Sequence, residues 1–161
     1  MKTLLLMRHA KSSWKQKDLP DMERLLNKRG EKDAPKMGRQ LKKKDMCPDM
    51  ILCSPAVRAR LTAEAVAKEC HFKKEIQYVD QLYMAEAAQI LEVVTHLPDD
   101  LKTVLLIGHN PGMEYTVQLL ARKIVALPTA SIAYLHIPID HWADLKEDTE
   151  CKLVKTWGPK D

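Results

Sequence analysis

The chain has 161 residues with 26 Lys and Arg against 22 Asp and Glu, a net charge of +4, and 45% of its residues are hydrophobic. This length and composition predict one globular domain over residues 1–161, because no repeat or low-complexity stretch divides the chain. The mild charge argues against a nucleic-acid binder, since the basic residues are scattered along the sequence and Phe72 is the only phenylalanine. No segment is long and apolar enough to span a membrane.

The first predicted element is a buried strand over Leu4 to Met7, within the stretch TLLLMRHAKSSW. Its apolar run ends at Arg8 and His9, too early for the core of a secretory signal peptide, and no small-residue cleavage site follows. The four cysteines show no zinc-type spacing and no C-x-x-C pair; they are Cys47, Cys53, Cys70 and Cys151. We therefore expect a reduced protein in the cytoplasm.

Further apolar runs predict strands that are buried on both faces, as in a parallel sheet covered by helices. They are residues 50–53, 75–79, 104–107, 132–137 and 152–157. Between them, apolar residues recur at helical spacing, as at Ala87, Ile90, Leu91 and Val94. This alternation predicts an α/β fold, a three-layer α/β/α sandwich around a mostly parallel sheet.

Prolines and caps mark where the predicted helices begin. Pro55 and Pro111 each stand at the start of a helical pattern, where a missing N–H costs little. Asn27 is suited to cap the helix that follows it. Pro35 interrupts that same helix, so we expect a kink or a restart there, with Asp33 as a second cap.

Polar side chains gather where three of the predicted strands end. Arg8 and His9 follow the first strand, Ser54 to Arg58 follow the second, and His109 follows the strand at 104–107. Open α/β sheets place their chemistry at the carboxyl ends of the strands, so these residues are expected to share one site.

Two arginines and two histidines are suited to phosphoryl transfer. A guanidinium presents donors that match phosphate oxygens and keeps its charge, so Arg8 and Arg58 are expected to hold the phosphoryl group. A deprotonated imidazole is a nucleophile that forms a phosphohistidine, and a second, protonated imidazole adds a hydrogen bond as charge develops. Arg58 on its own has another reading, an ion pair with Glu64 or Glu69 on its own helix. His71, His96, His136 and His141 stand outside such motifs and are expected to be packing or surface residues.

Four blocks of the sequence resemble the histidine phosphatase (phosphoglycerate mutase-like) superfamily in order, along essentially the whole chain. They are LLLMRHAKSSW, RLLNKRGEKDAPKMGRQL, ILCSPAVRARLTAEAV and VLLIGHNPGMEYTVQLL. Ala10 replaces the glycine of the usual R-H-G signature, and Leu25 and Asn27 replace a proline and a threonine of the next block. The short length and TASIA at 129–133 are most similar to the SixA-type phosphohistidine phosphatases.

The resemblance implies a role for each matching residue. His9 is the expected nucleophile, Arg8 and Arg58 the expected phosphate ligands, and His109 completes the pocket. Arg24 matches an arginine of the SixA-type pocket. Ser12 stands where the family often has a hydroxyl near the phosphate, although it is equally suited to a plain turn. The resemblance implies no metal ion and no cofactor.

One departure from the family bears on the substrate. Many members that cleave phosphate esters have a glutamate acid after the third strand, where this chain has Met84, with Glu86 two residues on. An ester oxygen leaves poorly without a proton, at a cost of about 10²–10⁴ in rate, whereas the ring of phosphohistidine leaves as neutral imidazole. We therefore expect a phosphohistidine substrate, carried by a partner protein, with Glu86 as a possible general acid.

Three alternatives stay open, which are a broad-specificity phosphomonoesterase, a mutase-like phosphotransferase and a non-catalytic relative that binds phosphorylated ligands. The sequence does not indicate an oligomeric state.

Overall fold

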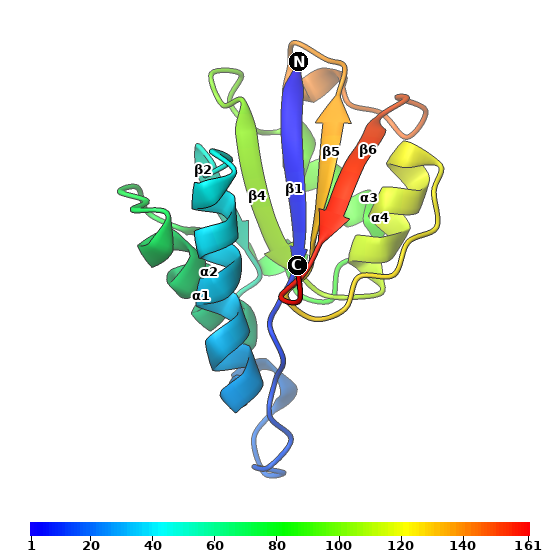
Figure 1. Ribbon diagram of the computed structural model, residues 1–161. Coiled ribbons are helices and arrows are strands. Elements are labelled where there is room, and N and C mark those ends of the chain that lie inside the picture. The colour runs from blue at the N-terminus through cyan, green and yellow to red at the C-terminus, as the bar shows by residue number, and fades with distance from the viewer.

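A computed structural model describes residues 1–161, and its six strands form one sheet in the order β3-β2-β4-β1-β5-β6 (Figure 1). The strands are β1 Lys2–Arg8, β2 Met50–Cys53, β3 Gln77–Tyr78, β4 Thr103–Gly108, β5 Ile132–Ile137 and β6 Lys152–Trp157. β1 pairs in parallel with β4, and β4 with β2, as expected for this fold. The exception is β5, which runs antiparallel to both of its neighbours, β1 and β6.

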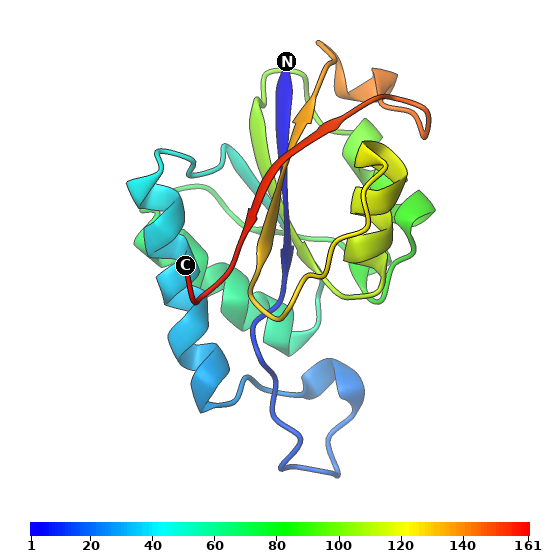
Figure 2. The ribbon, with the colours of Figure 1, turned by 45° about the vertical axis from the view of Figure 1, so that its right-hand side comes forward.

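Four helices cover the two faces of the sheet. They are α1 Lys28–Lys43, α2 Val57–Glu69, α3 Ala87–Thr95 and α4 Gly112–Ala121. Figure 2 shows α1 and α2 on one side of the sheet and α3 and α4 on the other, which is the expected three-layer sandwich. Short 3-10 turns lie at Asp21–Glu23, Asp80–Leu82 and Trp142–Asp144.

The central strand β1 explains why the apolar runs are continuous rather than alternating. Successive side chains of a strand point to opposite faces. Leu4 and Leu6 therefore pack into the core under α3 and α4, while Leu5 and Met7 pack into the core under α1 and α2. All four are fully buried.

The expected break at Pro35 is wrong, because α1 runs without interruption from Lys28 to Lys43. Asn27 caps this helix as predicted, its Oδ1 accepting from Gly30 N at 2.9 Å. Asp33 does not cap a second helix but pairs with Arg29 at 3.4 Å. An interior proline costs a helix about 3 kcal/mol. Burial of the helix's inner face, Ala34, Met37 and Leu41, offsets that cost.

The expectation of a fully reduced chain is also wrong, because Cys47 and Cys70 form a disulfide with their Cα atoms 5.7 Å apart. Cys47 follows α1 and Cys70 follows α2, so the packing of these two helices brings the cysteines together. Spacing along the sequence carries no trace of such a tertiary contact. Cys53 and Cys151 are free and buried.

None of the helices combines the length and the apolar character needed to cross a lipid bilayer. The cytoplasmic location stays a prediction from the sequence.

Candidate active site

The carboxyl ends of β2, β4 and β1 lie side by side in the sheet, and a cavity of about 300 Å³ opens there. His9 follows β1, His109 follows β4, and Arg58 lies in the first turn of α2 after β2. The cavity is lined by Arg8, His9, Lys11, Ser12, Trp14, Asp21, Arg24, Arg58, Met84, His109, Asn110 and Thr129. These include all six residues that were expected to form the phosphate site, which are Arg8, His9, Ser12, Arg24, Arg58 and His109.

His9 is buried and its ring has a defined proton position. The Nδ1 atom lies 2.7 Å from the carbonyl oxygen of Ala10, which accepts only, so Nδ1 carries the proton. The lone pair is therefore on Nε2. The amide of Ala10 in turn donates to Thr62 Oγ1 at 3.0 Å, and this hydroxyl donates to Arg58 O at 2.7 Å. These bonds hold the segment after β1 against α2.

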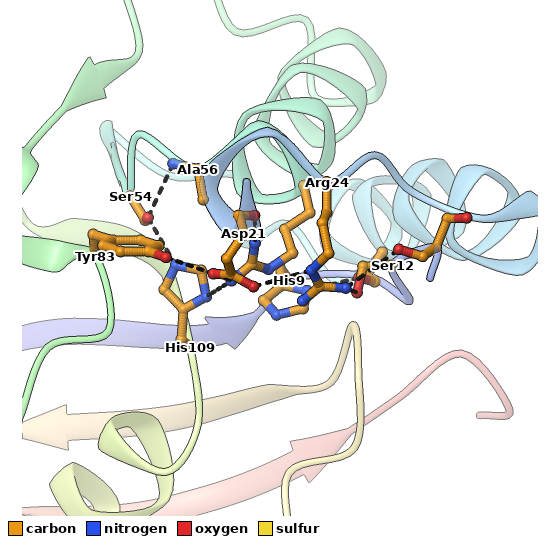
Figure 3. Close-up of polar contacts among 11 residues, drawn as sticks. His9, Ser12, Asp21, Arg24, Ser54, Ala56, Tyr83 and His109 are labelled. Carbon is orange, nitrogen blue, oxygen red and sulfur yellow. Dashed lines mark hydrogen bonds and ion pairs between the residues drawn. The ribbon is translucent and has the colours of Figure 1, made fainter. Parts of the chain in front are cut away.

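His109 faces His9 with the ring centroids 5.1 Å apart (Figure 3). Its Nε2 lies 2.8 Å from Ser54 Oγ, and its Nδ1 lies 3.4 Å from Nη2 of Arg58. A guanidinium only donates, so Nδ1 is the acceptor and Nε2–H points to the serine.

Burial and the nearby guanidinium groups keep both imidazoles neutral. Desolvation, followed by the charges of Arg58, Arg8 and Arg24, lowers the pKa of His9 to about 4. Desolvation, together with the charge of Arg58, lowers the pKa of His109 to about 3. The second imidazole was expected to be protonated. Without a bound anion it is neutral, because the charge of Asp21 does not offset its desolvation and the opposing charge of Arg58.

The arginines enter the cavity from three elements. Arg8 Nη1 donates to Leu127 O at 3.1 Å, and Arg24 Nη1 donates to Ser12 Oγ at 2.7 Å. Burial lowers the pKa of Arg8, although guanidinium groups keep their proton at working pH. The Nε atoms of Arg8 and Arg58 are buried without any hydrogen-bond partner.

Asp21 is the main site residue that the sequence reasoning missed. Its carboxylate receives Arg24 Nε and Arg58 Nη2, each at 3.0 Å, and also the hydroxyl of Tyr83 (Figure 3). The bond from Tyr83, together with the two arginines, holds the pKa of this carboxyl well below its usual range. The three-residue spacing of Asp21 and Arg24 on a short turn was an available signal. Tyr83 offered no comparable signal, whereas Ser54 had been expected at this edge of the sheet.

The structure does not bring Glu86 into the cavity. It is exposed and caps α3 in a capping box with Gln89. Met84 lines the cavity instead. The alternative pairing of Arg58 with its own helix is wrong, because Arg58 pairs with Asp21 and Glu69 pairs with Arg39.

The other histidines lie outside the cavity, as expected, and they are His71, His96, His136 and His141. No three His, Cys, Asp or Glu side chains are grouped so that they could hold a metal ion. The positive charge of the site comes from three arginines and a lysine, Arg8, Arg24, Arg58 and Lys11, against the one carboxylate of Asp21. Such a cavity can bind a dianion and present the free Nε2 of His9 to it.

Comparisons with known proteins identify the family and the fold. The sequence model of the histidine phosphatase superfamily (branch 1) matches residues 4–84, about half of the chain. An uncharacterized chloroplastic protein of Arabidopsis thaliana is 30% identical over 151 residues, which are 88% of this chain and 69% of that protein.

Solved structures are similar over almost the whole chain. SixA from Nakamurella multipartitia is 27% identical with a TM-score of 0.87, over 99% of this chain and 97% of that one. The protein histidine phosphatase SixA complexed with tungstate has a TM-score of 0.83 at 20% identity, over 98% and 97% of the two chains. The latter likeness concerns the fold alone.

Proposed function

The chain belongs to the histidine phosphatase superfamily, and from that premise we propose that it hydrolyses phosphohistidine on a partner protein through a phosphorylated His9. The observation that carries the choice of substrate is the lack of a usable acid beside the two histidines. Three groups near the cavity could in principle donate a proton, and none is suited to it: Asp21 is ionised, Tyr83 is a weak acid and Glu86 caps a helix.

Asp21 is the only carboxylate that lines the cavity. Its pKa is lowered far below neutrality by three donors, so it holds no proton to give. The bond to Asp21 raises the pKa of Tyr83, which makes this phenol a weaker acid than usual. Glu86 caps a helix outside the cavity. An ester alkoxide would leave unprotonated here, whereas a ring-protonated phosphohistidine needs no such donor.

In the first step the arginines hold the phosphoryl oxygens while His9 Nε2 attacks the phosphorus in line. The new N–P bond forms as the N–P bond of the substrate breaks, and its electron pair returns to the substrate ring. That ring already carries a proton on its other nitrogen, so it leaves as neutral imidazole. Ala10 O keeps the Nδ1 proton of His9 in place and stabilises the positive charge that the ring gains on phosphorylation.

In the second step water attacks the phosphorus of phosphorylated His9. The N–P bond breaks toward Nε2, inorganic phosphate forms, and the imidazole regains its starting state. His109 lies beside His9, and the dianion raises its pKa. Its Nδ1–H then donates to an oxygen of the phosphoryl group and not to the leaving group, so it stabilises the transferred group without acting as the acid.

The test is a side-by-side turnover measurement on a phosphohistidine protein and on several phosphomonoesters. We expect a kcat/KM at least 10²-fold higher for phosphohistidine, in line with the cost of a missing acid. Equal or higher kcat/KM on an ester refutes the choice of substrate.

A second measurement tests the intermediate. Incubation with a small phosphate donor is expected to leave an acid-labile, alkali-stable phosphate on His9, absent from the His9→Ala variant. Anion binding without turnover and without this phosphate indicates a non-catalytic relative instead.

A further inference from the structure

A band of basic side chains leads away from the candidate active site along α1. Helix α1 carries seven Lys and Arg against two Asp and Glu, an excess larger than the net charge of +4 of the whole chain. Seven of the 26 Lys and Arg of the chain thus lie on this one helix, and Arg29 in its first turn lines a hollow next to the active-site cavity.

Three hollows connect this helix to the active site. Thr129 lines both the 300 Å³ cavity and a neighbouring hollow of about 400 Å³. Arg29 and Lys160 line that second hollow and also a third, of about 370 Å³, which Lys32 and Lys36 border on α1. Arg29 and Lys36 are two helical turns apart, or about 10 Å along the axis.

We call the second and third hollows the basic track. Most of the basic side chains that line them form no ion pair. The basic residues of the track are Arg29, Lys32, Lys36 and Lys160, and its carboxylates are Asp33 and Asp161. Asp33 pairs with Arg29, while none of the three lysines forms an ion pair. Lys11, at the mouth of the active-site cavity, is exposed and also free of ion pairs.

We propose that the basic track binds an acidic segment of the protein that carries the phosphohistidine, so that the phosphorylated ring enters the cavity next to it. The inference rests on the proposed function and adds that the partner protein has an acidic segment near its phosphohistidine. Unpaired lysines beside a site steer an oppositely charged protein toward it and raise its rate of association.

A polypeptide fits this surface better than a nucleic acid does. Single-stranded nucleic acids need aromatic faces on which bases stack. The one aromatic side chain that lines the two hollows beyond the active-site cavity is Trp157, which is only 3% exposed. Carboxylates of Asp and Glu need only the ammonium groups.

The test compares Lys32→Glu/Lys36→Glu with Lys42→Glu/Lys43→Glu. Both pairs lie on α1 and change the net charge equally, but Lys42 and Lys43 lie in its last turn and line neither hollow of the track. We expect the first variant to lose at least tenfold in kcat/KM on an acidic phosphohistidine protein at low salt. The loss should shrink in 0.5 M salt, and phosphoramidate, a small donor, should be turned over as by the wild type.

Equal losses of kcat/KM in both variants overturn the proposal, since such losses reflect net charge alone. Loss of phosphoramidate turnover in the first variant also overturns it, because the site itself is then damaged. Direct binding separates this inference from the proposed function. A fluorescent oligoglutamate peptide should bind the wild type at least tenfold more tightly than Lys32→Glu/Lys36→Glu, whether or not phosphohistidine is hydrolysed. Tighter binding of an oligonucleotide of the same charge assigns the surface to nucleic acid and refutes the proposal.

Discussion

Acidification is expected to destabilise this protein through the two neutral histidines of the cavity. His9 has a pKa of about 4 when folded, against about 6.5 when exposed. Below pH 6.5 His9 is protonated in the unfolded chain but stays neutral in the folded chain, so the free energy of unfolding falls as the pH drops from 6.5 toward 4. Between pH 8 and pH 5 this amounts to about 2 kcal/mol for His9. His109 acts in the same direction, because its pKa is lowered as well.

The assay is urea unfolding at several pH values between 8 and 5, with the wild type and His9→Asn. Asparagine does not titrate, and its amide N–H replaces the Nδ1–H that donates to Ala10 O. We expect the variant to lose about 2 kcal/mol less than the wild type over this range. Parallel curves for the two proteins would show that His9 is not held neutral by burial, and would refute the reasoning. Inorganic phosphate should flatten the wild-type curve, because a bound anion stabilises the protonated rings.

Three further substitutions probe the site. Arg58→Ala should weaken the binding of inorganic phosphate and lower kcat/KM at least 10²-fold, while the far-UV circular dichroism stays native. Arg60→Ala, outside the cavity, should leave the kinetics unchanged. Asp21→Asn should lower the free energy of unfolding in urea at pH 7 by about 1 kcal/mol, a value kept small because the Asp21 side chain is 45% exposed and its ion pairs are screened by solvent. Asp18→Asn on the same loop should leave this free energy unchanged. Gly30→Ala places a Cβ 2.2 Å from Lys11 O, so we expect the free energy of unfolding to fall by about 1–3 kcal/mol and turnover to slow. A fully stable, active variant would contradict the close packing of α1 on this segment.

Local patterns in the sequence were sufficient for the sheet and for the meeting of the main site residues. The strands at 50–53 and 132–137 have the expected bounds, because continuous apolar runs mark strands that are covered on both faces. The strand at 152–157 also has the expected bounds, but it is an edge strand with mostly exposed side chains and not one buried on both faces. Parallel strands end at a common edge, so topology alone brought His9 and His109 to one cavity. The expected strand at 75–79 shrank to Gln77–Tyr78, since an exposed edge strand has little apolar surface to bury.

Contacts between distant segments decided what the sequence could not. Asp21 reaches Arg58 across 37 residues and Tyr83 across 62, and no local pattern encodes such bonds. The neutral state of the two imidazoles depends on burial, which is a property of the packed molecule. The continuous helix through Pro35 and the Cys47–Cys70 bond have the same origin, since each follows from how α1 packs on its neighbours. The sequence thus determined which groups reach the carboxyl edge of the sheet, and tertiary packing determined their protonation, their partners and the basic surface beside them.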